Sequence, residues 1–164
     1  MISIFTAVSL TYIIGSLLGY FIHKSLHSSW TMAGFRAHSS HHNIQYPPND
    51  YFSDVYRGAG KNNSVYLFLI ALSPPILFFA TLVYLGYIGW IITTIILIEA
   101  ALIGFLNDYI HDSFHIYNHW LNRSIFKNIF RKLNKLHMIH HIDQSKNFGI
   151  FDPTWDYIFK SLKS

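Results

Sequence analysis

The chain has 164 residues, of which 51% are hydrophobic and only 12% are charged, and its formal net charge is +4. Soluble domains carry roughly twice that charged fraction, so the composition favours a membrane protein, and the length suits a single domain. Cysteine is absent, which excludes disulfides, iron–sulfur clusters and cysteine-bound zinc or haem. Glu99 is the only glutamate, which excludes a ferritin-type site built from several glutamates, whereas 11 histidines are available as metal ligands.

Two apolar runs predict three membrane-spanning helices. Residues 2–22 carry no charge and cover about 30 Å as a helix, the thickness of the hydrocarbon core. A signal peptide is the alternative, but a basic n-region and an obvious cleavage site are missing. The apolar run 65–106 is about twice too long for one span, so we expect a hairpin of two spans, 65–85 and 87–108. Gly86 is the expected turn, and Pro74 and Pro75 are expected to kink the first of these two spans.

Charge distribution predicts the topology. Three spans place the polar regions 23–64 and 109–164 on one side, and all 12 Lys and Arg residues lie in those regions. The positive-inside rule makes that side cytoplasmic, and all 11 histidines lie there too. The positive charge therefore indicates topology, and no nucleic-acid partner is expected. The predicted fold is an all-α integral membrane protein, residues 1–164 as one domain, with about three transmembrane helices and a cytoplasmic helical cap.

Two further helices are predicted in the last polar region. Residues 124–136 place apolar side chains three to four apart, with basic residues between them, which predicts an amphipathic helix. Such a helix either lies among lipid headgroups or packs on its own domain. Asp152 and Pro153 predict a second helix start, with aspartate as the N-cap and proline as the first helical residue.

The histidines form four motifs in two rounds. HxxxH occurs at His23–His27 and at His111–His115, and HxxHH occurs at 38–42 and 137–141. Helical residues three or four apart project from one face, so each motif aims imidazoles at one place. The last two histidines of HxxHH differ by about 100° around the helix, so they can point at different metals. Ten imidazoles exceed the capacity of one metal and suit two. The predicted ligands are His23, His27, His38, His41, His42, His111, His115, His137, His140 and His141.

The order of spans and motifs resembles the fatty acid hydroxylase and sterol desaturase superfamily of membrane di-iron oxygenases. Two short stretches add to the resemblance, Ile110-His111-Asp112 and Asn147-Phe148-Gly149 followed by Trp155-Asp156. The resemblance implies that the motif histidines ligate two iron ions and that a membrane lipid, fatty acyl or sterol-like, is hydroxylated with O2 as co-substrate. A carotenoid hydroxylase or a lipid desaturase of the same superfamily is the alternative. Imidazole also binds zinc well, so zinc is possible in the isolated protein.

Five polar residues are candidates for supporting positions near the metals. Asn107 and Asp108 lie one helical turn before His111, and Asp112 precedes His115 by three residues, so each could accept the second N–H of a ligating imidazole. A polar helix end among headgroups is the alternative for all three. His119 continues the stripe of His111 and His115, and the resemblance makes Asn147 a polar group near the metals. Glu99 lies about 18 Å before His111 along a helix, so we expect a hydrogen-bonded structural role for it.

Two other classes of function are weighed against the oxygenase. A zinc hydrolase of the HExxH type needs a glutamate that the motifs lack. A metal carrier should place its ligands within the spans.

An oxygenase needs electrons, and no G-x-G-x-x-G fingerprint for a flavin or nicotinamide is present. We therefore expect an external donor of the ferredoxin or cytochrome b5 type with its reductase. Lys127, Arg131, Lys132 and Lys135 could dock that donor or bind anionic lipids. The sequence leaves the oligomeric state open.

Overall fold

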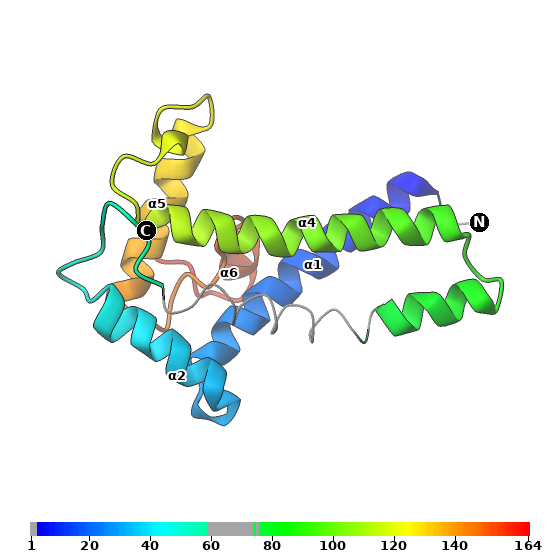
Figure 1. Ribbon diagram of the computed structural model, residues 1–164, viewed down its shortest axis with the longest axis horizontal. Coiled ribbons are helices and arrows are strands. Elements are labelled where there is room, and N and C mark those ends of the chain that lie inside the picture. The colour runs from blue at the N-terminus through cyan, green and yellow to red at the C-terminus, as the bar shows by residue number, and fades with distance from the viewer. Residues whose placement is uncertain (1–2, 59–73, 75) are drawn as a thin grey trace. The chain divides into compact units, whose positions relative to one another are not determined.

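The computed structural model describes residues 3–58, 74 and 76–164, and Figure 1 shows the ribbon. This part of the chain is helical apart from loops and one isolated β-bridge between Ser53 and Ile116, which confirms the predicted all-α class. Chain contacts divide it into two units, residues 1–16 with 60–106 and residues 17–59 with 107–164. The helices in chain order are α1 (Ile4–Leu26), η1 (Ser29–Thr31), α2 (Ala33–Ser40), η2 (His41–Gln45), α4 (Trp90–Phe114), η3 (Trp120–Asn122), α5 (Lys127–Ile142) and α6 (Thr154–Ile158).

Among the described residues, two helices are long and apolar enough to cross a membrane, α1 with 23 residues and α4 with 25. Both continue beyond the predicted spans, α1 through His23 and α4 through His111. The polar residues that follow each apolar run include no proline or glycine, so nothing in the sequence stops either helix there. The span predicted at 65–85 lies largely outside the described residues, of which 76–84 are helical.

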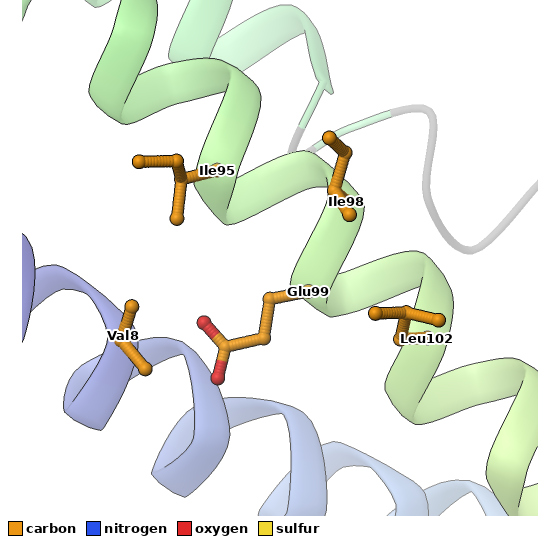
Figure 2. Close-up of a pocket in the computed structure, with 5 residues that line it drawn as sticks. All are labelled: Val8, Ile95, Ile98, Glu99 and Leu102. Atoms are coloured by element: carbon orange, nitrogen blue, oxygen red, sulfur yellow. The ribbon is translucent and has the colours of Figure 1, made fainter.

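The first unit shows how the apolar helices meet. A Cβ added at Gly15 of α1 would lie 2.9 Å from the Ile103 side chain of α4, so the small residue permits close approach. Figure 2 shows a nearby apolar pocket in which the Glu99 carboxyl group points between the helices, lined by Val8, Ile95, Ile98, Glu99 and Leu102. The Oε2 atom of Glu99 is buried and has no hydrogen-bond partner among the described residues. This oxygen atom therefore does not make the hydrogen bond expected for the carboxyl group.

The predicted turn at Gly86 is confirmed. Gly86 has a φ of +73°, a left-handed conformation that favours glycine. Its N–H donates to the Val83 carbonyl, and the Tyr87 N–H donates to the Leu82 carbonyl, both at 2.9 Å. This pair of bonds is the Schellman arrangement that ends a helix. The kink predicted at Pro74 and Pro75 falls partly outside the described residues.

The second unit packs α5 against the end of α4. Phe114 of α4 and Phe130 and Leu133 of α5 form a buried core with Ile150. The Asn134 side chain of α5 donates to the Phe114 carbonyl at 3.0 Å, which satisfies a terminal carbonyl of α4. These contacts fix the helix that carries one HxxHH motif on the helix that carries one HxxxH motif.

Two helix starts differ from the prediction. The helix α5 begins at Lys127 and not at Ser124, because the Ser124 hydroxyl accepts the Phe126 N–H at 3.1 Å and forms a local turn instead. The helix α6 begins at Thr154, with Pro153 before it and not inside it. Asp152 still caps it, since its Oδ1 accepts the Thr154 N–H at 2.9 Å.

Candidate metal centre

All ten predicted ligand histidines gather in the second unit. They come from four segments: the end of α1 and the turn after it, α2 with η2, the end of α4 and the next residue, and the last turns of α5. Each of three histidine groups has ligand nitrogens that lie within 4.8 Å of one another.

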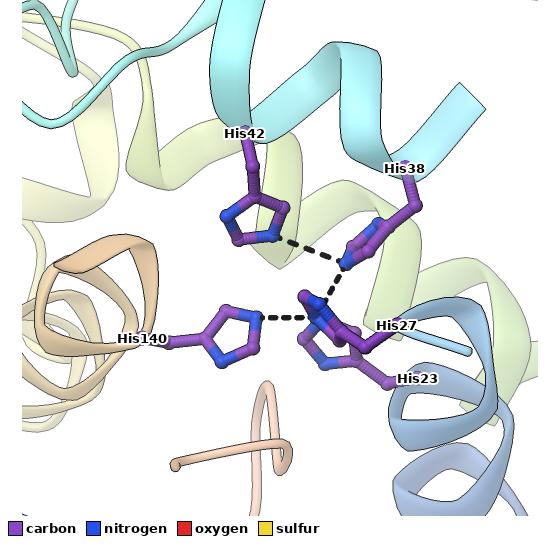
Figure 3. A group of neighbouring side chains, drawn as sticks. All are labelled: His23, His27, His38, His42 and His140. Carbon is purple, nitrogen blue, oxygen red and sulfur yellow. Dashed lines mark hydrogen bonds between the residues drawn. The ribbon is translucent and has the colours of Figure 1, made fainter. Parts of the chain in front are cut away.

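We name two of these groups as clusters. The His23 cluster contains His23, His27, His38, His42 and His140 (Figure 3). The His111 cluster contains His41, His111, His115 and His137. The third group links them, because it joins His41 and His42 to His141. Two adjoining groups of nitrogen donors provide places for two metal ions.

His41 and His42 are the first two residues of a π-helical turn. The helix α2 ends at Ser40 and the chain continues as η2, where the Tyr46 N–H donates to the His41 carbonyl at 2.9 Å. Isolated π turns often occur at functional sites. Here the neighbouring imidazoles diverge, His42 into the His23 cluster and His41 into the His111 cluster. The divergence matches the expectation from the HxxHH spacing.

Backbone carbonyls hold the outer nitrogens of four imidazoles. A carbonyl oxygen only accepts, so the Nδ1 atom that contacts it carries the proton, and the Nε2 atom of the neutral ring keeps a lone pair. This arrangement is typical of histidines that bind metals through Nε2. The four Nδ1-to-oxygen contacts are His23 to Phe148 at 2.7 Å, His115 to Tyr51 at 2.8 Å, His140 to Lys146 at 2.5 Å and His141 to Tyr46 at 2.9 Å.

The inner nitrogens face one another at short distances. The His137 Nε2 atom lies 3.0 Å from the Nε2 atom of His115 and 3.2 Å from that of His141. Both of those partners hold their proton at Nδ1, so at most one hydrogen serves the three nitrogens. In the His23 cluster, Nε2 contacts run from His140 to His27 at 3.0 Å, from His27 to His38 at 2.9 Å and from His38 to His42 at 3.1 Å.

The donor set therefore fits metal cations. Lone pairs that face one another repel unless a cation lies between them, and metal–nitrogen bonds of about 2.1 Å suit nitrogens at this spacing. The Nε2 atoms of His23, His41 and His111 are also buried without a hydrogen-bond partner in the described part of the chain. Buried polar atoms are rarely left unpartnered, and a bound ion is one accepted reason.

Burial keeps the imidazoles neutral. Removal from water lowers the pKa of His140 and of His141 to about 3, and that of His115 to about 2. It also lowers the pKa of His27 to about 4. Positive charge on neighbouring imidazoles adds to the shift for the first three. A metal ligand must be unprotonated, so these histidines are ready to bind metal at neutral pH.

A buried carboxylate, that of Asp156, supports the His23 cluster indirectly through a backbone peptide. Asp156 is fully buried and accepts the N–H groups of Phe148 at 2.8 Å and Gly149 at 2.7 Å, together with the Ser161 hydroxyl at 2.7 Å. The Phe148 carbonyl then accepts the proton of His23. A Cβ at Gly149 would lie 2.3 Å from the Asp152 carbonyl oxygen, so only glycine fits. Asp156 thus fixes the peptide that orients His23.

Asn147 lies in the same tail, but its side chain contacts backbone. Its amide nitrogen donates to the Leu136 carbonyl at 2.9 Å and the Lys163 carbonyl at 2.8 Å, and its oxygen accepts the Lys163 N–H at 2.8 Å. Its φ of 55° is left-handed, a conformation that asparagine tolerates. Asn147 therefore fixes the chain between Lys146 and Phe148, whose carbonyls hold His140 and His23.

Asp112 does not face the imidazole for which the spacing favours it. Its Oδ1 atom lies 3.3 Å from the Nδ1 atom of His111, while the Tyr51 carbonyl holds His115 instead. Asp108 is exposed and Asn107 is half-buried, and in the part of the chain that the structure describes no hydrogen bond joins either of them to an imidazole.

His119 lies outside the three groups. Its Nε2 atom is 3.3 Å from the Tyr109 hydroxyl and 3.2 Å from the Ser113 hydroxyl, and its Nδ1 atom accepts the Leu121 N–H at 3.4 Å. These contacts place it at the start of η3. The sequence did not indicate that the carbonyls of Tyr46, Tyr51 and Lys146 contact imidazoles, because every residue type has a backbone carbonyl.

Ten converging imidazoles define a nitrogen-ligated candidate metal centre, in a chain with two helices of membrane-spanning length. The chain belongs to the fatty acid hydroxylase family, whose model matches residues 8–161. Membership implies a membrane-bound di-iron oxidoreductase. A search of curated proteins and a search of solved structures found no significant match.

Proposed function

We propose that this chain is an O2-dependent di-iron oxygenase that hydroxylates an alkyl chain of a membrane lipid. The observation that carries the proposal is the set of inward-facing, buried Nε2 atoms in two linked clusters. When bound, a pair of iron ions supplies reductive activation of O2 and oxidation of an unactivated C–H bond. Imidazole alone does not choose iron over zinc, so the choice of iron rests on the family.

The two clusters would each hold one metal. The His23 cluster offers five imidazoles, and the His111 cluster offers four and adjoins His141. The carbonyls of Phe148, Lys146, Tyr51 and Tyr46 keep the Nδ1 protons of four ligands outside the centre. Most of these imidazoles are buried, and a site closed to water would protect a reactive oxidant.

The proposal also covers the source of the electrons and the orientation of the chain in the membrane. The chain contains no cysteine, so an external donor of the ferredoxin or cytochrome b5 type with its reductase would deliver the electrons. The distribution of Lys and Arg supports an orientation with the histidines on the cytoplasmic face. A reporter fused after Ser164 should then read cytoplasmic, and one inserted at Gly86 should read external. An external reading after Ser164 would contradict this orientation.

Lipid analysis of a host that expresses the chain tests the reaction. Hydroxylation adds one oxygen to a lipid, whereas desaturation removes two hydrogens, so mass spectrometry separates these outcomes and identifies the substrate class. Expression of His140→Ala is the matched control, since that variant loses an imidazole of the His23 cluster and should produce no new lipid. Purified, reduced protein that consumes no O2 with the lipids of a responsive host would contradict the proposal.

A further inference from the structure

The segment that joins α4 to α5, together with the first turns of α5, is unusually basic and apolar at once. No acidic residue occurs between Asp112 and Asp143, whereas five basic residues do. Four large apolar side chains are exposed there, Ile125 at 91%, Ile129 at 63%, Trp120 at 56% and Phe126 at 53%. Exposed apolar residues that gather in this way indicate a binding surface.

The apolar side of α5 extends beyond the core that it covers. Phe126 and Ile129 each precede a buried residue by one helical turn, Phe130 and Leu133, which are 4% and 8% exposed. Residues four apart lie on one helix face, so Phe126 and Ile129 continue the buried stripe past the point where the described core ends. Core packing therefore explains the second half of the amphipathic pattern and leaves the first half without a partner in the described chain.

We infer that this surface inserts among the headgroups of an anionic bilayer. We call it the η3–α5 surface, and it comprises Trp120, Ile125, Phe126, Ile129 and Lys132, because the exposed Lys132 lies one helical turn after Ile129 on the same side of α5. Interfacial helices combine a bulky apolar side with Lys and Arg, and tryptophan is enriched at the headgroup level. The absence of acids over the whole segment suits anionic lipids, which attract clustered basic residues.

A bilayer explains the surface better than an acidic protein donor does. A donor that must dock and leave for each electron uses a small interface and is steered by charge. Charge alone would not require four bulky apolar side chains exposed beside the basic residues. The inference rests on the membrane location of the family and not on the oxygenase reaction. Since α5 also carries His137, His140 and His141, an anchored surface would hold these ligands at a fixed depth.

The absence of cysteine allows a direct test. Single substitutions Ile125→Cys and Ile129→Cys place one fluorescent label on the surface of the full chain, without other thiols to remove. Asn128→Cys is the matched control, because Asn128 is exposed on the same helical turn but points away from the stripe of Phe126 and Phe130. Each labelled protein is placed in nanodiscs that contain phosphatidylglycerol and a lipid with a nitroxide near its headgroup.

We expect labels at 125 and 129 to be quenched several-fold more by the lipid nitroxide than the label at 128, and several-fold less by iodide in the water. Replacing phosphatidylglycerol with neutral lipid, or changing Lys132 to Glu, should reduce that contrast. Equal metal content in all labelled proteins shows that they are folded. Equal access of iodide to all three labels would overturn the inference. So would shielding of the labels at 125 and 129 by an added acidic ferredoxin or cytochrome b5 in place of lipid.

Discussion

The His23 cluster and the His111 cluster are built from the same two motifs, yet each borrows a histidine from the other round. His38 and His42 of the first HxxHH motif stay with His23 and His27, while the middle histidine, His41, joins the His111 cluster. In the second round His137 stays with His111 and His115, and the middle histidine, His140, joins the His23 cluster. Each of the two clusters therefore combines histidines from both rounds of motifs.

The two clusters also differ in what holds their imidazoles. The His23 cluster depends on the carbonyls of Phe148 and Lys146. The buried carboxylate of Asp156 fixes the Phe148 peptide through the Gly149 N–H, and the Asn147 side chain fixes the chain beside Lys146. The His111 cluster depends on the carbonyl of Tyr51, in a segment that pairs with the residues after α4 through backbone bonds between Ser53 and His115 and between Tyr117 and Ser53. Side-chain changes should therefore loosen the first cluster more easily than the second.

The largest effect is expected from the two crossing histidines. His140→Ala and His41→Ala should each abolish turnover and lower the metal content from two ions per chain, since each removes a nitrogen donor near both clusters. Elemental analysis after iron supplementation, with O2 consumption, provides the measurement. Full turnover by the His140 variant, or one metal or none in the parent protein, would show that the assignment of the two clusters is wrong. Finding zinc in place of iron would not contradict the assignment, because imidazole binds both metals.

Asp156→Asn should affect the His23 cluster alone. The amide presents an N–H group toward one of the two backbone N–H groups that the carboxylate accepts, so one of them loses its partner, at a cost of about 1–3 kcal/mol. Loss of such a supporting partner typically weakens metal affinity by about 10–100-fold. Titration with a chelator should therefore remove one metal early and the other at the parent's concentration.

The matched control for Asp156 is Asp152→Asn in the same tail. Its side chain keeps an oxygen that can accept the Thr154 N–H, and the Phe148 peptide is untouched. Two metals that leave Asp156→Asn together, at the parent's chelator concentration, would show that the carboxylate does not position His23.

Arg57→Ala is the corresponding change on the His111 side, and its effect should be smaller. Arg57 pairs with Asp50 at 2.6 Å and donates to the carbonyls of Gln45 and Phe52, so it braces the segment that contains Tyr51. The pair is exposed to solvent, and exposed ion pairs contribute little to stability. We expect a modest loss of the metal in the His111 cluster, measured by the same titration. Arg57→Lys keeps the charge but not the planar guanidinium group, so its loss of metal should fall between that of the parent protein and that of Arg57→Ala.

Much of this arrangement could be predicted from the sequence, and the parts that could not be predicted have a physical explanation. Apolar length predicted α1 and α4, and the spacing of His38, His41 and His42 predicted that adjacent imidazoles diverge. Which cluster each histidine enters could not be predicted, because that depends on how α2 and α5 pack in three dimensions. The carbonyls that hold the imidazoles are equally invisible in a sequence. The tail motif gave a signal at Asp156, but its residue type alone does not show whether it contacts a metal or a peptide.

The smallest effect on the metals is expected at His119, although it continues the stripe of His111 and His115. Its Nε2 atom faces the hydroxyls of Tyr109 and Ser113, and its Nδ1 atom accepts the Leu121 N–H at the start of η3. Loss of a capping acceptor costs about 0.5–2 kcal/mol, whereas loss of a ligand empties a site. His119→Ala should therefore keep two metals and lower Tm by roughly 2–4 °C for each kcal/mol lost. His115→Ala, one helical turn earlier, is the comparison, because it removes an imidazole whose Nε2 atom lies 3.0 Å from that of His137. A loss of metal in His119→Ala as large as that in His115→Ala would make His119 a ligand, and the His111 cluster would extend beyond the residues assigned to it.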